Sequence, residues 1–424
     1  MKNFLLIFLW ISSLIIAGLY TYENPEKIEV SKNYLRGTVY SYLKKDKIKS
    51  NQVKVEEGSI QTVTANSFLV EFSKIISISG RTAFISYEDN NSNFDIESLK
   101  IYTQDGRLTK NFFTENLDIP NSFTLDNNGG VKTIFKHKKN EFALVSSLSG
   151  ECYYASIILL NEGKEIFKTE CLPSNAIDFN GLGSSNIHYE NKIFLSIGAP
   201  EAVSSKIRLL AQDNNSVFGK ILEINKDDLD KIISDQKNNF KYKIFTNGHR
   251  NPQGLTKIKN SIFSVEHGPK GGDELNLIKK DRNYGWPLVS YGTRYLSEND
   301  GKSHEISHEN SNFEEPLFAH LPSFGLSGLN TCPNILKKYY KKPCLLGLSL
   351  YGFGSPGRSI IIYLLNNKMD KVHSIEKIYL RDDFRLRHFV TNSKNELYED
   401  ENGSIYVSVD FRGIYKISFK EFRN

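Results

Sequence analysis

The sequence predicts an all-β fold built from repeated short strands, and two observations support this. A weak repeat, in which turn residues precede an apolar and aromatic run that often ends in Ser, recurs along the chain. Its copies are 80–86, 140–146, 191–196, 260–265, 343–349 and 403–408. Each interval has room for about four short strands, the size of one blade of a β-propeller. The sequence therefore predicts a six-bladed β-propeller.

Helical patterning is sparse within this domain. One persuasive helix, 226–235, follows directly after the expected strand 219–224 and is interpreted as an insertion. A β-sandwich needs fewer strands, and an α/β fold needs regular helices. The formal net charge of +5 is small and dispersed along the chain, so nucleic acid is not an expected partner.

The N-terminus predicts export. Residues 4–20 form an apolar run without a charge, near the lower length limit for a membrane span. The same run fits the apolar core of a secretory signal, so a signal anchor and a cleaved signal peptide over 1–22 both stay open. Either alternative places the rest of the chain on the periplasmic side, membrane-anchored or secreted. The polar, Lys-rich residues 23–52 predict a linker, which leaves 53–424 for the propeller.

The four cysteines form two local pairs. Cys152 and Cys171 flank two expected strands around a short Gly-containing turn, so they would face each other across a hairpin. Cys332 and Cys344 bracket a short basic loop that a disulfide could close. This pattern is typical of an oxidising compartment, with four unrelated buried thiols as the alternative. The spacings do not fit a zinc site.

The stretch 247–295 holds the densest set of chemically capable residues. Arg250, in the block HRNPQG, offers five donors in a planar fork that suits carboxylates or quinone oxygens. The block EHGPKGGDE, 266–274, is a glycine-rich turn that ends in paired carboxylates, and its oxygens suit a hard cation such as calcium. The block NYGWP, 283–287, adds an aromatic wall with polar groups.

These blocks resemble the glucose/sorbosone dehydrogenase family, above all its aldose sugar dehydrogenase branch. Members of that family are sugar dehydrogenases that use pyrroloquinoline quinone (PQQ) and calcium on a six-bladed β-propeller. The resemblance implies oxidation of an aldose CH–OH group to a lactone, with hydride transfer to the quinone. It implies PQQ and Ca²⁺ as cofactors, and a small-molecule sugar and a periplasmic electron acceptor as partners.

The resemblance also implies cofactor contacts. Arg250 and Asn251 fall on an Arg-Asn pair that contacts the cofactor, where Arg250 would polarise the quinone. Tyr295 matches a further cofactor contact. Arg385 and Arg387 resemble an Arg-x-Arg-Asp element that meets the cofactor carboxylates. Because these two arginines alternate in a strand, a solvated basic face is the alternative interpretation.

Four positions match metal-binding positions of the family. Gly268 and Pro269 fall near the cofactor-bound calcium, and Glu274 and Tyr284 match metal-binding positions of the aldose branch. Glu274 could instead brace a turn. Asp273 and Glu274 alone do not support a third hypothesis, a metal-dependent hydrolase or lactonase on the same propeller.

Several positions depart from the family pattern. Asn180 stands where the family has its general base, a His, and the alternative alignment on 127–130 also lacks a His. An amide cannot accept a proton, and a general base contributes about 10²–10⁴-fold to such reactions. Tyr351 stands where a cofactor-contacting Lys is expected, and His388 stands where the Asp is usual. The Gln expected in the first blade cannot be located.

These departures support an alternative function, a non-catalytic exported propeller that binds a glycan or a protein partner. His188, His267 and His388 are candidates to replace the missing base, but their spacing favours none of them.

Overall fold

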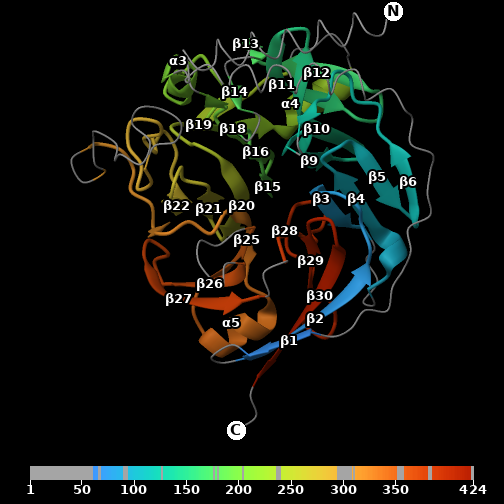
Figure 1. Cartoon of the computed structure of the whole chain (residues 1–424), viewed down its shortest axis with the longest axis vertical. Helices are drawn as coiled ribbons and strands as arrows, with labels where there is room; N and C mark the ends of the chain where they lie inside the picture. Colours follow the sequence, from blue (N-terminus) through green and yellow to red (C-terminus); the bar gives the residue numbers. More distant parts are fainter. Residues whose placement is uncertain are drawn as a thin grey trace, which may run out of the picture.

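The six-bladed β-propeller predicted from the sequence is confirmed. Figure 1 shows small β-sheets arranged in a ring around a central axis, and we number these blades one to six in chain order. This computed structural model describes residues 61–64, 68–88, 94–125, 128–174, 177–178, 181–202, 205–234, 240–293, 308, 311–350, 358–380 and 384–421.

The first three blades are antiparallel sheets that begin at the axis and run outward. Blade one contains β3 (Thr82–Tyr87), β4 (Leu99–Thr103), β5 (Arg107–Lys110) and β6 (Phe113–Asn116). Blade two contains β9 (Val131–His137), β10 (Asn140–Ser149), β11 (Cys152–Leu159) and β12 (Lys164–Lys168), with β13 (Leu172–Pro173) paired to β11. Blade three contains β15 (Asn186–Tyr189), β16 (Lys192–Ile197), β18 (Lys220–Asn225) and β19 (Lys243–Thr246).

The last three blades follow the same order. Blade four contains β20 (Pro252–Ile258), β21 (Ser261–Glu266), β22 (Asp273–Ile278) and β23 (Phe318–His320). Blade five contains β24 (Leu326–Thr331), β25 (Cys344–Ser349), β26 (Ser359–Leu365) and β27 (Val372–Tyr379). Blade six contains β28 (Leu386–Phe389), β29 (Ile405–Val409), β30 (Gly413–Glu421), β2 (Phe68–Ile76) and β1 (Gln61–Thr64).

Short elements decorate the ring. Two small ladders pair β7 (Thr124–Leu125) with β8 (Asn128–Gly129), and β14 (Ile177–Asp178) with β17 (Glu201–Ala202). The helices are η2 (Ile96–Ser98), α3 (Ser205–Arg208), η4 (Leu209–Ala211), α4 (Lys226–Ser234) and α5 (Asn334–Tyr340).

The ring closes through a composite sheet. Strand β2 pairs antiparallel with β30, from Phe68 opposite Glu421 to Ile76 opposite Ile414. The blue strand β2 therefore lies beside the red strand β30 in Figure 1. On the inner side, β28 contacts β3, so the innermost strands touch in a closed cycle. Because strands from both ends of the described chain share blade six, this pairing holds the ring closed.

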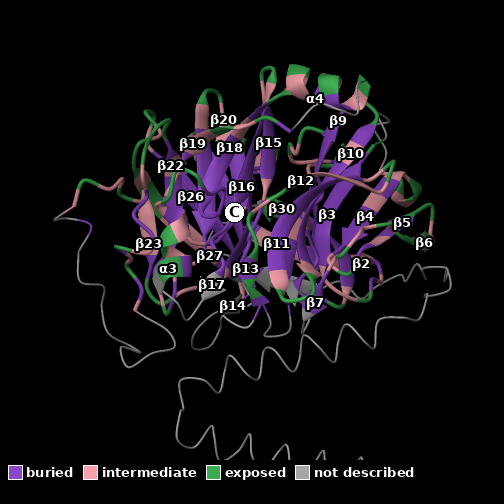
Figure 2. Cartoon of the chain, turned by 90° about the horizontal axis from the view of Figure 1, so that it is seen from above, coloured by how far each residue is buried: buried purple, intermediate pink, exposed green. Residues whose placement is uncertain are grey.

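The second strand of each blade packs on both faces against its neighbours, which explains the sequence repeat. Strands β16, β25 and β29 are almost wholly buried, and Figure 2 shows such strands in purple with exposed residues at the loops. Burial on both faces favours continuous apolar runs over alternation. The copy at 80–86 belongs to the innermost strand β3, which is equally buried, whereas the other copies are second strands.

The helix predicted at 226–235 is confirmed as α4, between β18 and β19. Prediction of a plain loop at 333–343 was wrong, because α5 lies there. Within the described ranges no helix is long and apolar enough to cross a membrane. The apolar run 4–20 and the linker 23–52 lie outside those ranges, so the predictions for them stay untested.

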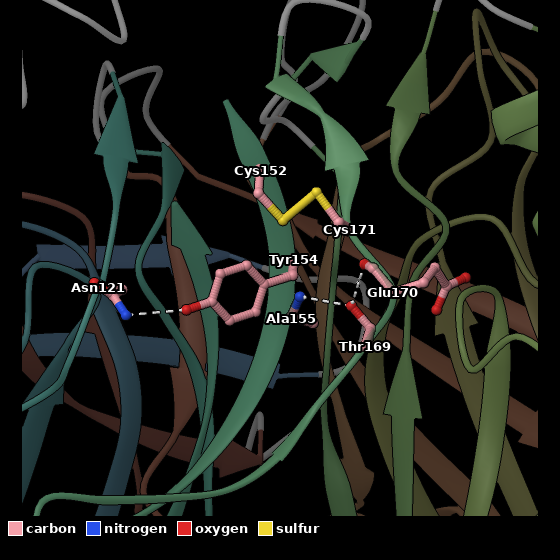
Figure 3. Close-up of a disulfide and its surroundings, with 7 residues drawn as sticks. All are labelled: Asn121, Cys152, Tyr154, Ala155, Thr169, Glu170 and Cys171. Carbon is pink, nitrogen blue, oxygen red and sulfur yellow. Dashed lines mark hydrogen bonds between the residues drawn. A yellow bond between two sulfur atoms is a disulfide. The ribbon is translucent and has the colours of Figure 1, made fainter. Parts of the chain in front are cut away.

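Both predicted disulfides are present. Cys152 is bonded to Cys171 beside β11, and Cys332 is bonded to Cys344 across α5, with Cα–Cα distances of 5.2 and 5.4 Å. Figure 3 shows the first bridge next to the Thr169 hydroxyl, which accepts a hydrogen bond of 3.0 Å from the Ala155 amide.

The two disulfides differ in exposure, which predicts an order of reduction. Cys332 and Cys344 are buried, whereas Cys152 is half-buried and Cys171 is exposed. We expect mild reductant to open the Cys152–Cys171 bridge first, and loss of the buried bridge to lower the free energy of unfolding by about 3 kcal/mol. Mass mapping of alkylated protein at increasing reductant checks this, and simultaneous opening or crossed pairs would contradict it.

Candidate active site

The chain segments that start the innermost strands meet at one face of the ring. Asn251, directly before β20, accepts a hydrogen bond of 2.6 Å through Oδ1 from the amide of Gly183, shortly before β15. Lys132, at the start of β9, donates to the carbonyl of Gly181 at 3.2 Å. Turns between second and third strands return to the same face, because neighbouring strands are antiparallel. We call this the site face; it comprises residues 81, 132, 181–183, 250–251, 267–273, 385–387 and 410.

Arg250 and Asn251 are brought together with the glycine-rich turn of blade four. The Arg250 guanidinium donates through Nη1 to the carbonyls of His267 (3.0 Å) and Gly268 (2.8 Å) and lies 5.2 Å from the ring of Trp286. The Asn251 amide nitrogen lies 3.3 Å from His267 Nδ1. The sequence-predicted pair therefore sits on the turn that was predicted to bind calcium.

Glu266 binds the backbone of this pair, a role that the sequence analysis did not predict. Its Oε2 accepts hydrogen bonds from the backbone amides of Arg250 (2.8 Å) and Asn251 (3.4 Å), and its Oε1 lies 3.0 Å from His249 Nδ1. Burial alone would raise the pKa of this carboxyl, but His249 and the two backbone amides outweigh burial and lower it. A buried carboxylate thus fixes the backbone that carries Arg250.

Asp273 shapes the turn itself. Its Oδ1 accepts from the Gly268 amide at 3.0 Å, and its Oδ2 accepts from the amides of Phe324 and Gly325 at 3.0 and 2.6 Å. A Cβ on Gly268 would lie 2.2 Å from the Gly271 carbonyl oxygen, so only glycine fits there. These contacts give Gly268 and Pro269 a fixed backbone whether or not a metal binds.

Glu274 and Tyr284 are not brought together at a shared side-chain site. Glu274 Oε2 accepts from Asn276 Nδ2 at 3.1 Å, and burial followed by the charge of Glu266 raises the pKa of Glu274 well above its usual value. The Tyr284 hydroxyl donates to the Leu277 carbonyl at 2.6 Å, three residues further along β22, roughly 10 Å away on an extended strand. Their predicted metal roles stay predictions.

Arg385 and Arg387 surround a buried carboxylate on blade six. Arg387 binds Asp410 with two hydrogen bonds, Nε–Oδ1 at 2.5 Å and Nη2–Oδ2 at 2.7 Å, and Arg385 Nε lies 3.3 Å from Oδ2. Arg81, before β3, lies 3.7 Å from the same oxygen. Arg387 is 6% exposed, so the alternative of a solvated basic face does not hold for Arg387, whereas the Arg385 side chain is half-buried.

This arginine cluster, Arg81, Arg385 and Arg387, carries more positive charge than Asp410 neutralises. The pKa of Arg81 is lowered to about 10 by burial and by the like charge of Arg387. Burial and Arg387 also lower the pKa of His388 to about 3, which keeps it neutral. The site face is therefore suited to a ligand with several carboxylates.

Some predicted residues lie outside the described ranges. These are Asn180, Tyr295 and Tyr351. Other functional candidates were missed by the sequence reasoning: Arg81, Lys132, Glu266 and Asp410. Asp410 had a usable signal, since it follows directly after the last repeat copy and its strand β29.

Comparison with known proteins decides the family. The sequence profile of the family described as Glucose / Sorbosone dehydrogenase matches residues 158–410, more than half of the chain. The chain belongs to this family. The match includes Arg250, the glycine-rich turn and Asp410, but ends short of Arg81 and Lys132 on the N-terminal side.

Two named sugar dehydrogenases are similar in sequence to parts of this chain. Aldose sugar dehydrogenase YliI of Escherichia coli is 34% identical over 113 residues, 25% of this chain and 29% of that protein. Quinoprotein glucose dehydrogenase B of Acinetobacter calcoaceticus is 41% identical over 83 residues, 19% of this chain and 17% of that protein. The matched segments thus span less than a third of either relative.

A solved structure shares the fold over nearly the whole ring. The PQQ-bound form of aldose sugar dehydrogenase from Streptomyces coelicolor superposes with a TM-score of 0.54 at 16% identity. The alignment covers 88% of this chain and 99% of that chain. At this identity the similarity shows the propeller fold alone, so the chemistry is argued from the site residues.

Proposed function

We propose that the protein is a PQQ-dependent sugar dehydrogenase that oxidises an aldose hydroxyl group. The observation that carries the proposal is the meeting, on one face of the ring, of Arg250 and Asn251 from blade four with the arginine cluster around Asp410. Family membership and the quinoprotein relative support the same chemistry. When bound, the quinone would supply the acceptor for a hydride, which carries both electrons of the oxidation.

The residues present fit an anionic quinone. Among the described residues the three arginines share the single negative charge of Asp410, so the cluster can bind cofactor carboxylates. Arg250 would stabilise negative charge on a quinone oxygen. Its position is preset by Glu266, which fixes the backbone at Arg250 and Asn251. His267 Nε2 is buried without a hydrogen-bond partner in the described part of the chain and could contact the cofactor.

Calcium fits the described residues less well. The Gly268 carbonyl, a predicted ligand, already accepts a hydrogen bond from Arg250. No group of three or more His, Cys, Asp or Glu side chains gathers within the described residues. Gly268 and Pro269 would hold Ca²⁺ through backbone carbonyl oxygens, and the Gly268 carbonyl would be available to it only without the hydrogen bond from Arg250.

The setting of the reaction is also proposed. Two disulfides are typical of exported proteins, so we place the protein on the periplasmic side, anchored or secreted through residues 1–22. A sugar and an electron acceptor would be its partners. Asn180 favours the second candidate, a non-catalytic exported propeller that binds a glycan or a protein.

Reconstitution of the purified protein with PQQ and Ca²⁺ separates these candidates. We expect quinone binding and aldose-dependent dye reduction by the wild type. Absence of quinone binding would refute the enzyme and leave the binding propeller.

Arg250→Ala is expected to slow reduction of the bound quinone about 10²–10³-fold, because a donor to the developing charge is lost. The fold should persist, since Glu266 binds the backbone amide of residue 250 and not its side chain. Arg282→Ala, on an exposed arginine of the same blade, is the matched control. Single-turnover kinetics with aldose measure the effect, and an unchanged rate would contradict the assigned role.

A further inference from the structure

Lys132 is a lysine on the site face that lacks an acidic partner. It lies at the start of β9, the innermost strand of blade two, and its ammonium donates to the Gly181 carbonyl. Within the described residues it forms no ion pair. Lys136, on the same strand, instead contacts both Glu88 and Glu141. An ammonium that is partly removed from water and lacks a counter-charge lowers the stability of the fold. Packing therefore does not explain why a lysine stands at this position.

Its surroundings favour the neutral amine. The pKa of Lys132 is lowered to about 7, first because burial removes water from the ammonium, then because Arg387 and Arg81 carry like charge. The nearby carboxylate of Asp410 is bound by those arginines. The neutral amine, which can accept a proton, is therefore accessible near neutral pH.

The hydrogen-bond partner of Lys132 belongs to the segment that leads into β15. Gly181, the hydrogen-bond partner of Lys132, directly follows Asn180, and Gly183 two residues on is bonded to Asn251. The Lys132 amine thus lies against the segment that leads into β15, near enough to Arg387 and Arg81 for their charges to act on it.

The histidine candidates fit less well. Burial and then the charge of Lys226 lower the pKa of His188 to about 3. His137, at the opposite end of β9 from Lys132, adds a smaller effect in the same direction. His388 has a pKa of about 3, so both are weak bases at neutral pH. Burial also lowers the pKa of His267, whose Nδ1 lies against the Asn251 amide.

We propose that Lys132 is the general base of the sugar oxidation, an inference that rests on the proposed function. The neutral amine accepts the proton of the sugar C1 hydroxyl and becomes an ammonium. The C1–H bond breaks and its hydrogen leaves with both electrons as hydride to the bound quinone, while the C1–O bond becomes the carbonyl of the lactone. The proton on Lys132 completes the two-electron, two-proton reduction of the quinone and restores the amine.

The first test needs no cofactor. Lysine Cε resonances of selectively ¹³C-labelled, cofactor-free protein are followed against pH. We expect two of them to titrate near 7: Lys132, and Lys220, whose ammonium is enclosed by three backbone carbonyls. Lys132→Gln and Lys220→Gln assign the two signals. Titration of Lys132 near 10, the value of an exposed lysine, would overturn the proposal.

The second test separates a base from a charge. Lys132→Arg keeps the positive charge but stays protonated, so it should bind PQQ within a few-fold of the wild type and reduce it about 10²–10⁴-fold more slowly with aldose. Asn180→His in that variant should restore part of the rate. Lys192→Gln, on an exposed lysine paired with Glu223, should change neither quantity.

The outcomes distinguish this inference from the proposed function. The wild-type rate should rise with pH through the pKa of Lys132, which bound anions shift upward, and this limb should vanish in Lys132→Arg. Quinone binding with an undiminished rate in Lys132→Arg overturns the role of Lys132 and leaves the dehydrogenase standing. If Lys132→Arg loses affinity for the quinone but the bound quinone is reduced at an unchanged rate, Lys132 binds the cofactor and is not the general base. No quinone binding by the wild type refutes both.

Discussion

Asp410→Asn is expected to lower the free energy of unfolding by about 3–5 kcal/mol, because it leaves the arginine cluster without its buried counter-charge. Asp410 is 5% exposed and binds Arg387 with both carboxylate oxygens. Urea denaturation at neutral pH measures the loss. Asp281→Asn, on a largely exposed aspartate, is the control and should cost less than about 0.5 kcal/mol.

The same substitution has a pH signature. Burial would raise the pKa of Asp410, but Arg387 and Arg385 outweigh it and lower the pKa below its usual value near 3.8. Stability from a lowered carboxyl pKa is present above the unfolded pKa and is lost as pH falls through the folded one. The wild type should therefore lose its advantage over Asp410→Asn below about pH 4. A difference that is constant across this range would contradict the ion-pair explanation.

Glu266→Gln is expected to destabilise the protein by about 3 kcal/mol and to weaken quinone binding, because it removes the buried negative charge beside His249 and turns one of the two acceptors into a donor that faces Asn276 Nδ2. Thermal unfolding and quinone titration measure the two effects. The matched control is Glu274→Gln, on the residue opposite Glu266 in the β21–β22 ladder.

Glu274 differs from Glu266 in its protonation. A raised pKa means that Glu274 holds its proton in the fold, so the amide of Gln is a close substitute and should cost less than about 1 kcal/mol. Stability from a raised carboxyl pKa is present below the unfolded pKa and is lost as pH rises through the folded one. Glu274→Gln should therefore gain on the wild type as pH rises. Equal losses in both variants would show that the two carboxyls do not differ.

The ring of blades was predictable because burial on both faces leaves a continuous apolar run in every second strand. One copy of the repeat lies on an innermost strand instead, since β3 is buried as fully as a second strand and so gives the same pattern. Helix α5 was missed because its seven residues lie between a proline and a lysine-rich turn, with no side-chain cap at its N-terminus. Short elements like this depend on tertiary contacts more than on local pattern.

Site residues divide in the same way. Arg250 and Asn251 were predictable because they stand in the block HRNPQG, whose hydrogen-bond donors lie close together in the sequence. Asp410 and Lys132 were missed because their importance arises from partners far along the chain, such as Arg81 for Asp410. No sequence spacing records that a lysine on one strand lies beside a glycine 49 residues later.

Strand β2 and strand β30 bring together residues such as Glu71 and Lys420, 349 positions apart. A contact of that span is costly in loop entropy until the intervening blades are in place, so blade six should be the slowest to assemble. Until then both strands expose unpaired backbone, and each can be extended by the complementary strand of a second molecule. Refolding at high protein concentration should therefore yield dimers in which β2 of each molecule completes blade six of the other.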